Sequence, residues 1–283
     1  MDPLGCETGG GKFILEELHL VCKIQRALSL QGSESMDDQF AGQVALVTGA
    51  GSGIGRATAL ALARQGGKIV CLDLAGTEDV VRDIERLGGT ALGRKIDVRD
   101  SQGWRQIVEE TVDAFGFVDI LVSSAGIAVS GDRAAEVPEE IWDRILDINA
   151  KGVWLGMKYV LPLMIARKRG KIVNVASTAA HIGLRDAAAY CASKGAVLAL
   201  TRQAGVQYAA HNIQINSVSP GTTMTGIQRD VTDEQRAAFM KLTPIGRFAE
   251  ADEIAAVIVF LCSSGSSFMA GADVGIDGGM VAF

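Results

Sequence analysis

Short apolar runs, mostly of β-branched residues, alternate with longer amphipathic stretches from residue 42 to the end of the chain. Continuous apolar runs are typical of strands buried on both faces of a parallel sheet, and the longer stretches carry apolar residues at helical spacing. The alternation therefore predicts an α/β fold with a doubly wound, seven-stranded parallel sheet and helices on both faces. The expected strands are 43–50, 68–74, 91–98, 118–126, 170–177, 213–220 and 272–279, and the expected helices are 53–66, 77–88, 101–116, 138–168, 188–211 and 250–265.

The composition excludes several classes of protein. A formal charge of −6 over 283 residues argues against a broad basic face for nucleic acid. No uncharged apolar run reaches the length of about 18 residues that a membrane span needs. Three scattered histidines and five scattered cysteines, without a C-x-x-C pair, support neither a metal site nor a disulfide framework. We therefore expect no metal, no membrane contact and a reducing location, the cytoplasm.

The chain divides into an extension and one folded domain. Residues 1–41 precede the first strand pattern and are expected to be a dispensable or disordered extension. Residues 42–283 contain no repeat and no proline- or serine-rich linker, which predicts a single domain. The segment 222–247 interrupts the alternation after the sixth strand. Because ligands bind at the carboxyl ends of such strands, we expect this segment to form a lid.

A glycine-rich turn follows the first strand and opens the first helix, as "VTGAGSGIGRA". Gly49, Gly53 and Gly55 allow a tight turn and a close approach of the backbone to a pyrophosphate. The free N–H groups of the helix N-terminus favour the same anion. The strand–turn–helix context predicts a dinucleotide site in a Rossmann fold.

Asp73 ends the second strand, 18 residues after Gly55. This is close to the spacing of an acid that binds the ribose diol of NAD. A carboxylate there would repel a 2′-phosphate, and neither Ser52 nor Leu74 supplies a cation for one. Arg56 lies inside the helix. The residues therefore favour NAD over NADP, with a loop or helix-capping carboxylate as the alternative role of Asp73.

From residue 42 to 281 the chain resembles the short-chain dehydrogenase/reductase family. The motifs that carry the resemblance occur in family order: Thr48 with the three glycines, Asp97-Val98, "SSAG" at 123–126, Asn149, Ser177, Tyr190 with Lys194, and Pro220-Gly221. One departure is the end of the fourth strand, where the family has N-N-A-G and this chain has Ser123-Ser124-Ala125-Gly126.

The resemblance implies the roles of the site residues. Asn149, Ser177, Tyr190 and Lys194 would form a catalytic tetrad, in which Asn149 also kinks its helix. The expected cofactor contacts, counting Tyr190 and Lys194, are Gly49, Ser52, Gly53, Ile54, Gly55, Asp73, Leu74, Asp97, Val98, Ser124, Ala125, Gly126, Pro220, Gly221, Thr223 and Thr225.

Tyr190 and Lys194 lie four residues apart and would share one face of a helix. A free tyrosine has a pKa of about 10, too high for a base near neutrality. A nearby ammonium and a positive nicotinamide ring both favour the phenolate. We therefore expect Tyr190 to be the general acid and base, activated by Lys194, in the interconversion of a secondary alcohol and a ketone with NAD.

The substrate is expected to be a small, mostly apolar alcohol or ketone, because most of the side chains expected near the reacting carbon are apolar. These are Ile127, Ala128, Val129, His181 to Leu184, Met224, Ile227, Phe239 and Met240. His181 either bonds a second substrate oxygen or is a loop residue. The alternatives for the whole chain are a 3-oxoacyl-thioester (acyl-carrier-protein) reductase and a non-catalytic, cofactor-binding scaffold. The apolar long helices and the resemblance together predict a homotetramer.

Overall fold

The computed structural model describes residues 38–129, 131–225 and 232–282. Gln39–Phe283 form one compact unit. This unit begins before the predicted boundary at residue 42, because Phe40 is fully buried and its N–H donates to the carbonyl of Gln65 at 2.9 Å. The predicted extension lies almost wholly outside the described residues.

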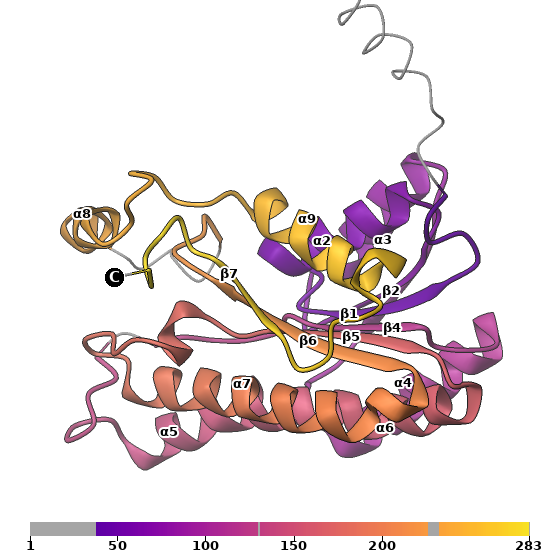
Figure 1. Ribbon diagram of the computed structural model, residues 1–283, viewed down its shortest axis with the longest axis horizontal. Coiled ribbons are helices and arrows are strands. Elements are labelled where there is room, and N and C mark those ends of the chain that lie inside the picture. The colour runs from indigo at the N-terminus through magenta and orange to yellow at the C-terminus, as the bar shows by residue number, and fades with distance from the viewer. Residues whose placement is uncertain (1–37, 130, 226–231, 283) are drawn as a thin grey trace, which may run out of the picture. The chain divides into compact units, whose positions relative to one another are not determined.

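The sheet has seven parallel strands in the order β3-β2-β1-β4-β5-β6-β7 (Figure 1). This confirms the predicted doubly wound sheet. The order reverses between β1 and β4, and ligands bind at such a switch point, beyond the carboxyl ends of the strands. The strands are β1 Val44–Thr48, β2 Lys68–Asp73, β3 Thr90–Lys95, β4 Ile120–Ser123, β5 Gly170–Val175, β6 Ile213–Pro220 and β7 Asp273–Ile276.

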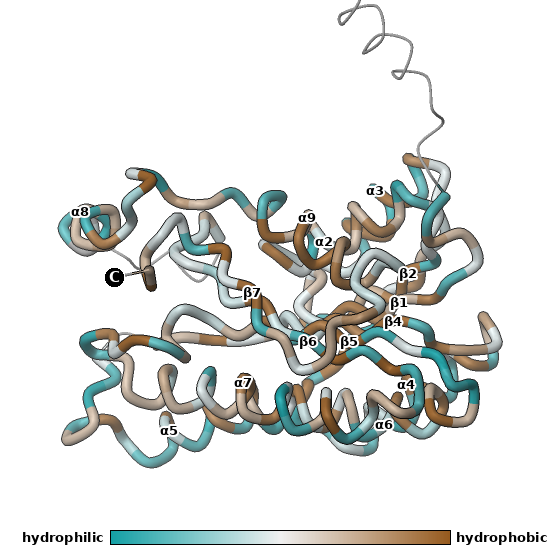
Figure 2. Tube along the Cα trace, in the orientation of Figure 1, coloured by the Kyte–Doolittle hydropathy of each residue, from teal (hydrophilic) through white to brown (hydrophobic). Residues whose placement is uncertain are grey.

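Helices cover both faces of the sheet (Figure 1). One face packs against α2 Gly53–Arg64, α3 Thr77–Arg86 and α9 Ala251–Cys262. The other packs against α4 Ser101–Phe115, α5 Glu139–Leu146, α6 Gly152–Arg167 and α7 Ala188–Tyr208. Within β1, Ala45 and Val47 belong to the first apolar core, whereas Val44 and Leu46 belong to the second. Figure 2 shows apolar residues gathered along the central strands and polar residues along the outer sides of the helices.

The predicted helix 138–168 is divided by a π-helical turn, Asp147–Lys151, between α5 and α6. Asn149 lies in this turn and is fully buried. Its side-chain amide accepts from the N–H of Ile127 at 2.8 Å and donates to the carbonyl of Ile127 at 2.9 Å. Single π turns are frequent at functional sites, and this one aims Asn149 at the loop after β4.

The fourth strand is shorter than the predicted 118–126. The N–H groups of Ser124 and Ala125 donate to the hydroxyl of Thr48, at 3.0 and 3.1 Å, instead of pairing with a neighbouring strand. The lid predicted at 222–247 includes α8 Asp233–Lys241 and six residues, 226–231, outside the described ranges. Its role as a lid stays a prediction. None of the described helices is long and apolar enough to cross a membrane.

Candidate active site

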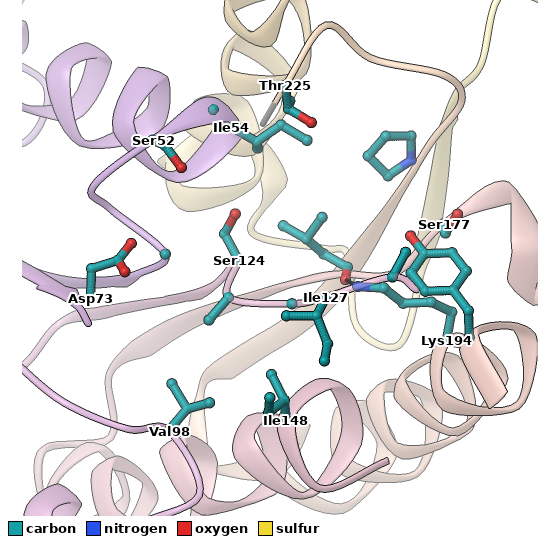
Figure 3. A pocket seen from close by; sticks show the side chains of 18 of the residues that line it. Ser52, Ile54, Asp73, Val98, Ser124, Ile127, Ile148, Ser177, Lys194 and Thr225 are labelled. Carbon is teal, nitrogen blue, oxygen red and sulfur yellow. Dashed lines mark hydrogen bonds between the residues drawn. The ribbon is translucent and has the colours of Figure 1, made fainter. Parts of the chain in front are cut away.

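A cavity of about 580 Å³ lies at the carboxyl ends of the central strands. In Figure 3, Ser52 and Asp73 lie at one end of this cavity, and Ser177 and Lys194 lie at the other. The site is therefore long and has two chemically different ends. The predicted residues that line it are Gly49, Ser52, Gly53, Ile54, Asp73, Leu74, Asp97, Val98, Ser124, Ala125, Gly126, Ser177, Tyr190, Lys194, Pro220, Gly221, Thr223 and Thr225.

Two predicted site residues, Gly55 and Asn149, do not line the cavity. Gly55 is buried behind the glycine turn, and a Cβ there would come within 2.2 Å of the carbonyl oxygen of Gly49. Glycine at this position therefore lets α2 pack closely on the turn. Asn149 lies behind the wall. It holds Ile127 of the lining and donates to the hydroxyl of Ser193 at 3.0 Å.

The glycine turn fits a pyrophosphate. Gly49 and Gly53 have φ of +68° and +52°, a region that disfavours other residues. Ser52 is the N-cap of α2, but its side chain makes no capping hydrogen bond. The first N–H groups of α2 therefore have no capping hydrogen-bond partner in the Ser52 side chain, and Gly53 and Ile54 line the cavity. A helix N-terminus of this kind favours a phosphate as its ligand.

Gly51 is a residue of this turn that the sequence analysis did not assign. A Cβ there would come within 2.2 Å of the carbonyl oxygen of Ala75 and 3.0 Å of Asp73 Oδ2. Its N–H donates to Asp73 Oδ2 at 2.9 Å. The signal was present as a further glycine between Gly49 and Gly53, but its need for glycine arises from contact with the end of β2.

Asp73 holds a loop, which is the alternative role considered above, and its contact with a ribose diol stays a prediction. Oδ1 accepts from the N–H groups of Leu74 and Ala75, at 2.6 and 3.4 Å, and Oδ2 accepts from Gly51. The carboxylate thus holds the loop and also lines the cavity. Because a carboxylate offers about four acceptor positions, it can still accept a hydroxyl.

The wall beyond Asp73 carries an ion pair. Arg99 donates to both carboxylate oxygens of Asp97, with its Nη2 2.6 Å from Oδ2, and it holds the pKa of Asp97 below its usual value. Other lining residues that the sequence analysis did not assign are Ile96, Arg99, Arg144, Ile148, Val175 and Ala176.

At the opposite end, α7 presents Tyr190 and Lys194 one turn apart. The Lys194 ammonium lies 5.8 Å from the centroid of the Tyr190 ring and donates to the carbonyl of Val175 at 2.8 Å. Burial lowers the pKa of Lys194 to about 8. Burial also raises the pKa of the Tyr190 phenol, while the hydrogen bond with Ser177 acts to lower it. The phenol is therefore held protonated unless further positive charge comes near it.

Asp132 is a residue that supports Tyr190 and that sequence reasoning missed. Its buried carboxylate accepts from the N–H groups of Ala189 and Tyr190, both at 2.9 Å. Asp132 thereby caps the start of α7 from a loop 57 residues earlier in the chain. No local signal marks it, because a helix cap is normally read from the residue next to the helix.

The residues expected around the substrate are only partly brought together. Ile127 and Ala128 line the cavity. Ile227 lies outside the described residues. Val129, the segment 181–184, Met224, Phe239 and Met240 are not among the lining residues. His181 instead bonds Asp273, with its Nε2 2.8 Å from Oδ2. Among the described residues, no three His, Cys, Asp or Glu side chains are grouped as metal ligands.

Comparison with known proteins agrees with this geometry. A family model described as enoyl-(acyl carrier protein) reductase matches residues 49–281. The fold, the glycine turn and the Ser177–Tyr190–Lys194 arrangement define a nicotinamide-dependent oxidoreductase of the Rossmann type. The chain belongs to the short-chain dehydrogenase/reductase family, whose members bind NAD or NADP.

Three curated relatives illustrate the range of the family. Cyclohexanol dehydrogenase of Acinetobacter sp. (strain SE19) is 38% identical, over 86% of this chain and 96% of that protein. Cis-4-hydroxycyclohexanecarboxylate dehydrogenase of Sinomonas cyclohexanicum is 40% identical, over 87% and 100%. 3-Oxoacyl-[acyl-carrier-protein] reductase of Thermotoga maritima is 36% identical, over 85% and 98%. A solved short-chain type dehydrogenase/reductase from Mycobacterium marinum superposes with a TM-score of 0.83 and 32% identity, over 88% and 98%.

Proposed function

We propose that this enzyme interconverts a small, mostly apolar secondary alcohol and its ketone, with NAD as the cofactor. One observation carries the proposal: Ser177, Tyr190 and Lys194 share a single cavity with the glycine turn and Asp73. A proton-transfer group and a dinucleotide site at opposite ends of one cavity are what alcohol oxidation requires.

The glycine turn and the N-terminus of α2 would hold the pyrophosphate of the cofactor, and Asp73 would hold the ribose diol. The nicotinamide side would lie against Pro220, Gly221, Thr223 and Thr225. When bound, the oxidised cofactor would supply a hydride acceptor and the positive charge of its nicotinamide ring. The Ser177 hydroxyl holds the substrate oxygen, and the Tyr190 phenol takes or returns the hydroxyl proton. Lys194 keeps an ammonium close to the Tyr190 ring through its bond to Val175.

Burial favours the protonated state of Tyr190, because desolvation raises the pKa of its phenol. In this state the phenol holds the proton that ketone reduction delivers to the forming alkoxide. Alcohol oxidation needs the phenolate, and each unit by which the pKa falls requires about 1.4 kcal/mol of preferential interaction. Lys194 and the positive nicotinamide ring are the charges that we propose for this interaction.

Our preference for NAD rests on charges around the end of β2. The carboxylate of Asp73 lies in the lining, where a 2′-phosphate would meet a like charge. Arg56, a cation in α2, is paired with Asp83 at 2.5 Å. Leu74, next along the chain, is 57% exposed and apolar. These features favour a free 2′-hydroxyl.

The substrate class follows from the lining near Ser177 and from the relatives. Ile127, Ala128 and Ala176 give this end of the cavity an apolar wall. Two relatives act on hydroxylated cyclohexane rings, by their names. We therefore place an alicyclic secondary alcohol first among the substrates.

The test is a screen of cyclohexanol, a straight-chain secondary alcohol and a hydroxysteroid, each with NAD+ and NADP+. We expect the highest kcat/KM for cyclohexanol with NAD+, measured by the absorbance of the reduced cofactor. Turnover of none of the three with either cofactor would contradict the proposal.

The second candidate is a 3-oxoacyl-thioester reductase, which the Thermotoga maritima relative favours. It would use NADPH, so the same screen includes a 3-oxoacyl thioester with NADH and NADPH. Preferred reduction of the thioester with NADPH would replace our proposal. A non-catalytic scaffold is disfavoured because Ser177, Tyr190 and Lys194 are all present and all line the cavity.

We also propose a homotetramer in a reducing compartment such as the cytoplasm. Exposed apolar side chains support assembly: Trp154 on α6 is 44% exposed, Phe260 on α9 is 46% exposed, and Phe268 is fully exposed. Free thiols at Cys71, Cys191 and Cys262 fit a reducing location. Size-exclusion chromatography with light scattering should give about four times the chain mass of 29.7 kDa. A monomer mass would refute the assembly.

A further inference from the structure

Four polar side chains form a cluster beside the last two strands, outside the cavity lining. The cluster consists of His181, Ser217, Ser219 and Asp273, and we call it the His181 cluster. Asp273 begins β7, and its side chain is 9% exposed. It accepts from the hydroxyls of Ser217 at 2.5 Å and Ser219 at 2.8 Å. Its Oδ2 also lies 2.8 Å from Nε2 of His181.

The His181 cluster is not arranged for nucleophilic catalysis. Asp273 and Ser219 both meet the same ring nitrogen of His181, at 2.8 and 3.2 Å. A nucleophile–base–acid triad needs the serine and the carboxylate on opposite ring nitrogens. The hydroxyl of Ser219 is moreover bonded to the carboxylate. The bonds of the cluster therefore join segments of the chain and do not prepare an attacking group.

The segments that it joins include the turn that carries Ser177. Ser177 is the N-cap of the short 3-10 helix Thr178–Ala180, and its hydroxyl accepts from the N–H of Ala179 at 3.1 Å. His181 ends this turn, because its N–H donates to the carbonyl of Thr178 at 2.9 Å. The turn is thus held at its start by β5 and at its end by the bond from His181 to β7.

The other strand in the cluster also leads to the cavity. Ser219 is followed directly by Pro220 and Gly221, which line the cavity. The carboxylate of Asp273 therefore joins the amino end of β7 and the carboxyl-terminal half of β6 to the end of the Ser177 turn. The hydrogen bond between His181 and Asp273 spans 92 residues of sequence.

We propose that His181 and Asp273 are positioning residues, which fix the Ser177 hydroxyl by holding the far end of its turn against β6 and β7. This rests on the proposed function of Ser177 in binding the substrate oxygen. A substrate oxygen must be held within a fraction of an ångström, so a small shift of the turn lowers turnover more than it lowers cofactor binding.

The main experiment is a double-mutant cycle of His181→Ala and Ser177→Ala. In the native background, His181→Ala should lower kcat about tenfold and leave the KM for NAD+ within about threefold, because the cofactor contacts lie mainly on other segments. In the Ser177→Ala background, the same change should alter kcat by less than about twofold, since the hydroxyl that it positions is gone. Equal losses in both backgrounds, or a loss confined to KM, would overturn the proposal.

Three further variants keep the result interpretable. His211→Ala removes a histidine from the 3-10 turn Ala209–His211 that follows α7, where its ring centroid lies 6.5 Å from that of Tyr208, and should leave kcat unchanged. Asp273→Asn keeps the side-chain shape and an acceptor oxygen, so it should retain more activity than Asp273→Ala. Equal losses in the two Asp273 variants would show that an acceptor oxygen at this position does not hold the turn, and they would count against the proposal.

A measurement on the free enzyme separates this proposal from the proposed function. Hydrogen exchange of the amides of residues 178–182 should be faster in His181→Ala than in His211→Ala, because the end of the turn is released. Unchanged exchange there would overturn the positioning role whatever the substrate is. Normal turnover by Tyr190→Phe would instead overturn the proposed chemistry and leave the exchange result standing.

Discussion

Replacing Tyr190 with Phe should lower kcat by about 10²–10⁴-fold, which is the usual contribution of a general acid or base. The change removes one oxygen, the group that exchanges a proton with the substrate, and keeps the ring that packs beside Lys194. The KM for NAD+ should change little, since the glycine turn and Asp73 are untouched. Steady-state rates with the best alcohol of the screen give both constants.

The matched control is Tyr208→Phe, the same substitution near the other end of α7. Tyr208 contacts the ring of His211 and lies outside the cavity lining. Tyr208→Phe should leave kcat within about twofold of the native value, as is usual for a change away from the reacting groups. If Tyr190→Phe keeps more than about a tenth of native kcat, another group transfers the proton and the mechanism is wrong.

Asp73→Asn should raise the ratio of kcat/KM for NADP+ to that for NAD+ by about 10–100-fold. The amide keeps the shape of the side chain and an acceptor for the N–H of Gly51, so the turn should stay folded. The change removes the negative charge that a 2′-phosphate would meet, and such like-charge contacts cost several kcal/mol. The increase in this ratio should stay limited, because Arg56 remains paired with Asp83 and is not free to bind the 2′-phosphate.

Asp79→Asn is the control for the second prediction. Asp79 is an exposed carboxylate in the first turn of α3, paired with Arg82, and it does not line the cavity. In this variant, the ratio of kcat/KM for NADP+ to that for NAD+ should equal the native ratio. A native enzyme that prefers NADP+, or an Asp73→Asn variant with an unchanged ratio, would show that Asp73 does not select the cofactor.

Local patterns predicted the strands well because each is decided by a few neighbouring residues. The predicted range 213–220 coincides with β6, and all five residues of β1 are buried, as a continuous apolar run predicts. The predicted strand ends were less accurate where a side chain from a distant part of the sequence hydrogen-bonds a backbone group that would otherwise pair with a neighbouring strand. The hydroxyl of Thr48 ends β4 in this way, although Thr48 and Ser124 lie 76 positions apart in the sequence.

The sequence motifs predicted the residues of the candidate site, but they did not predict which residues hold those side chains in position. The chain order of Gly49, Asp73, Ser177 and Tyr190 on successive elements was enough to place them at one edge of the sheet. Gly55 and Asn149 were predicted as site residues, and the structure places both behind the lining, where Gly55 packs on the turn and Asn149 holds Ile127.

The sequence by itself determined the doubly wound sheet, the cavity at its carboxyl edge and the pairing of Tyr190 with Lys194. Each depends on spacing within one element or on the fixed direction of parallel strands. Only the tertiary structure decided that Asp132 caps α7 at Tyr190 and that His181 bonds Asp273. Those contacts join residues 58 and 92 positions apart, and no local periodicity specifies which distant polar groups meet once the strands are assembled.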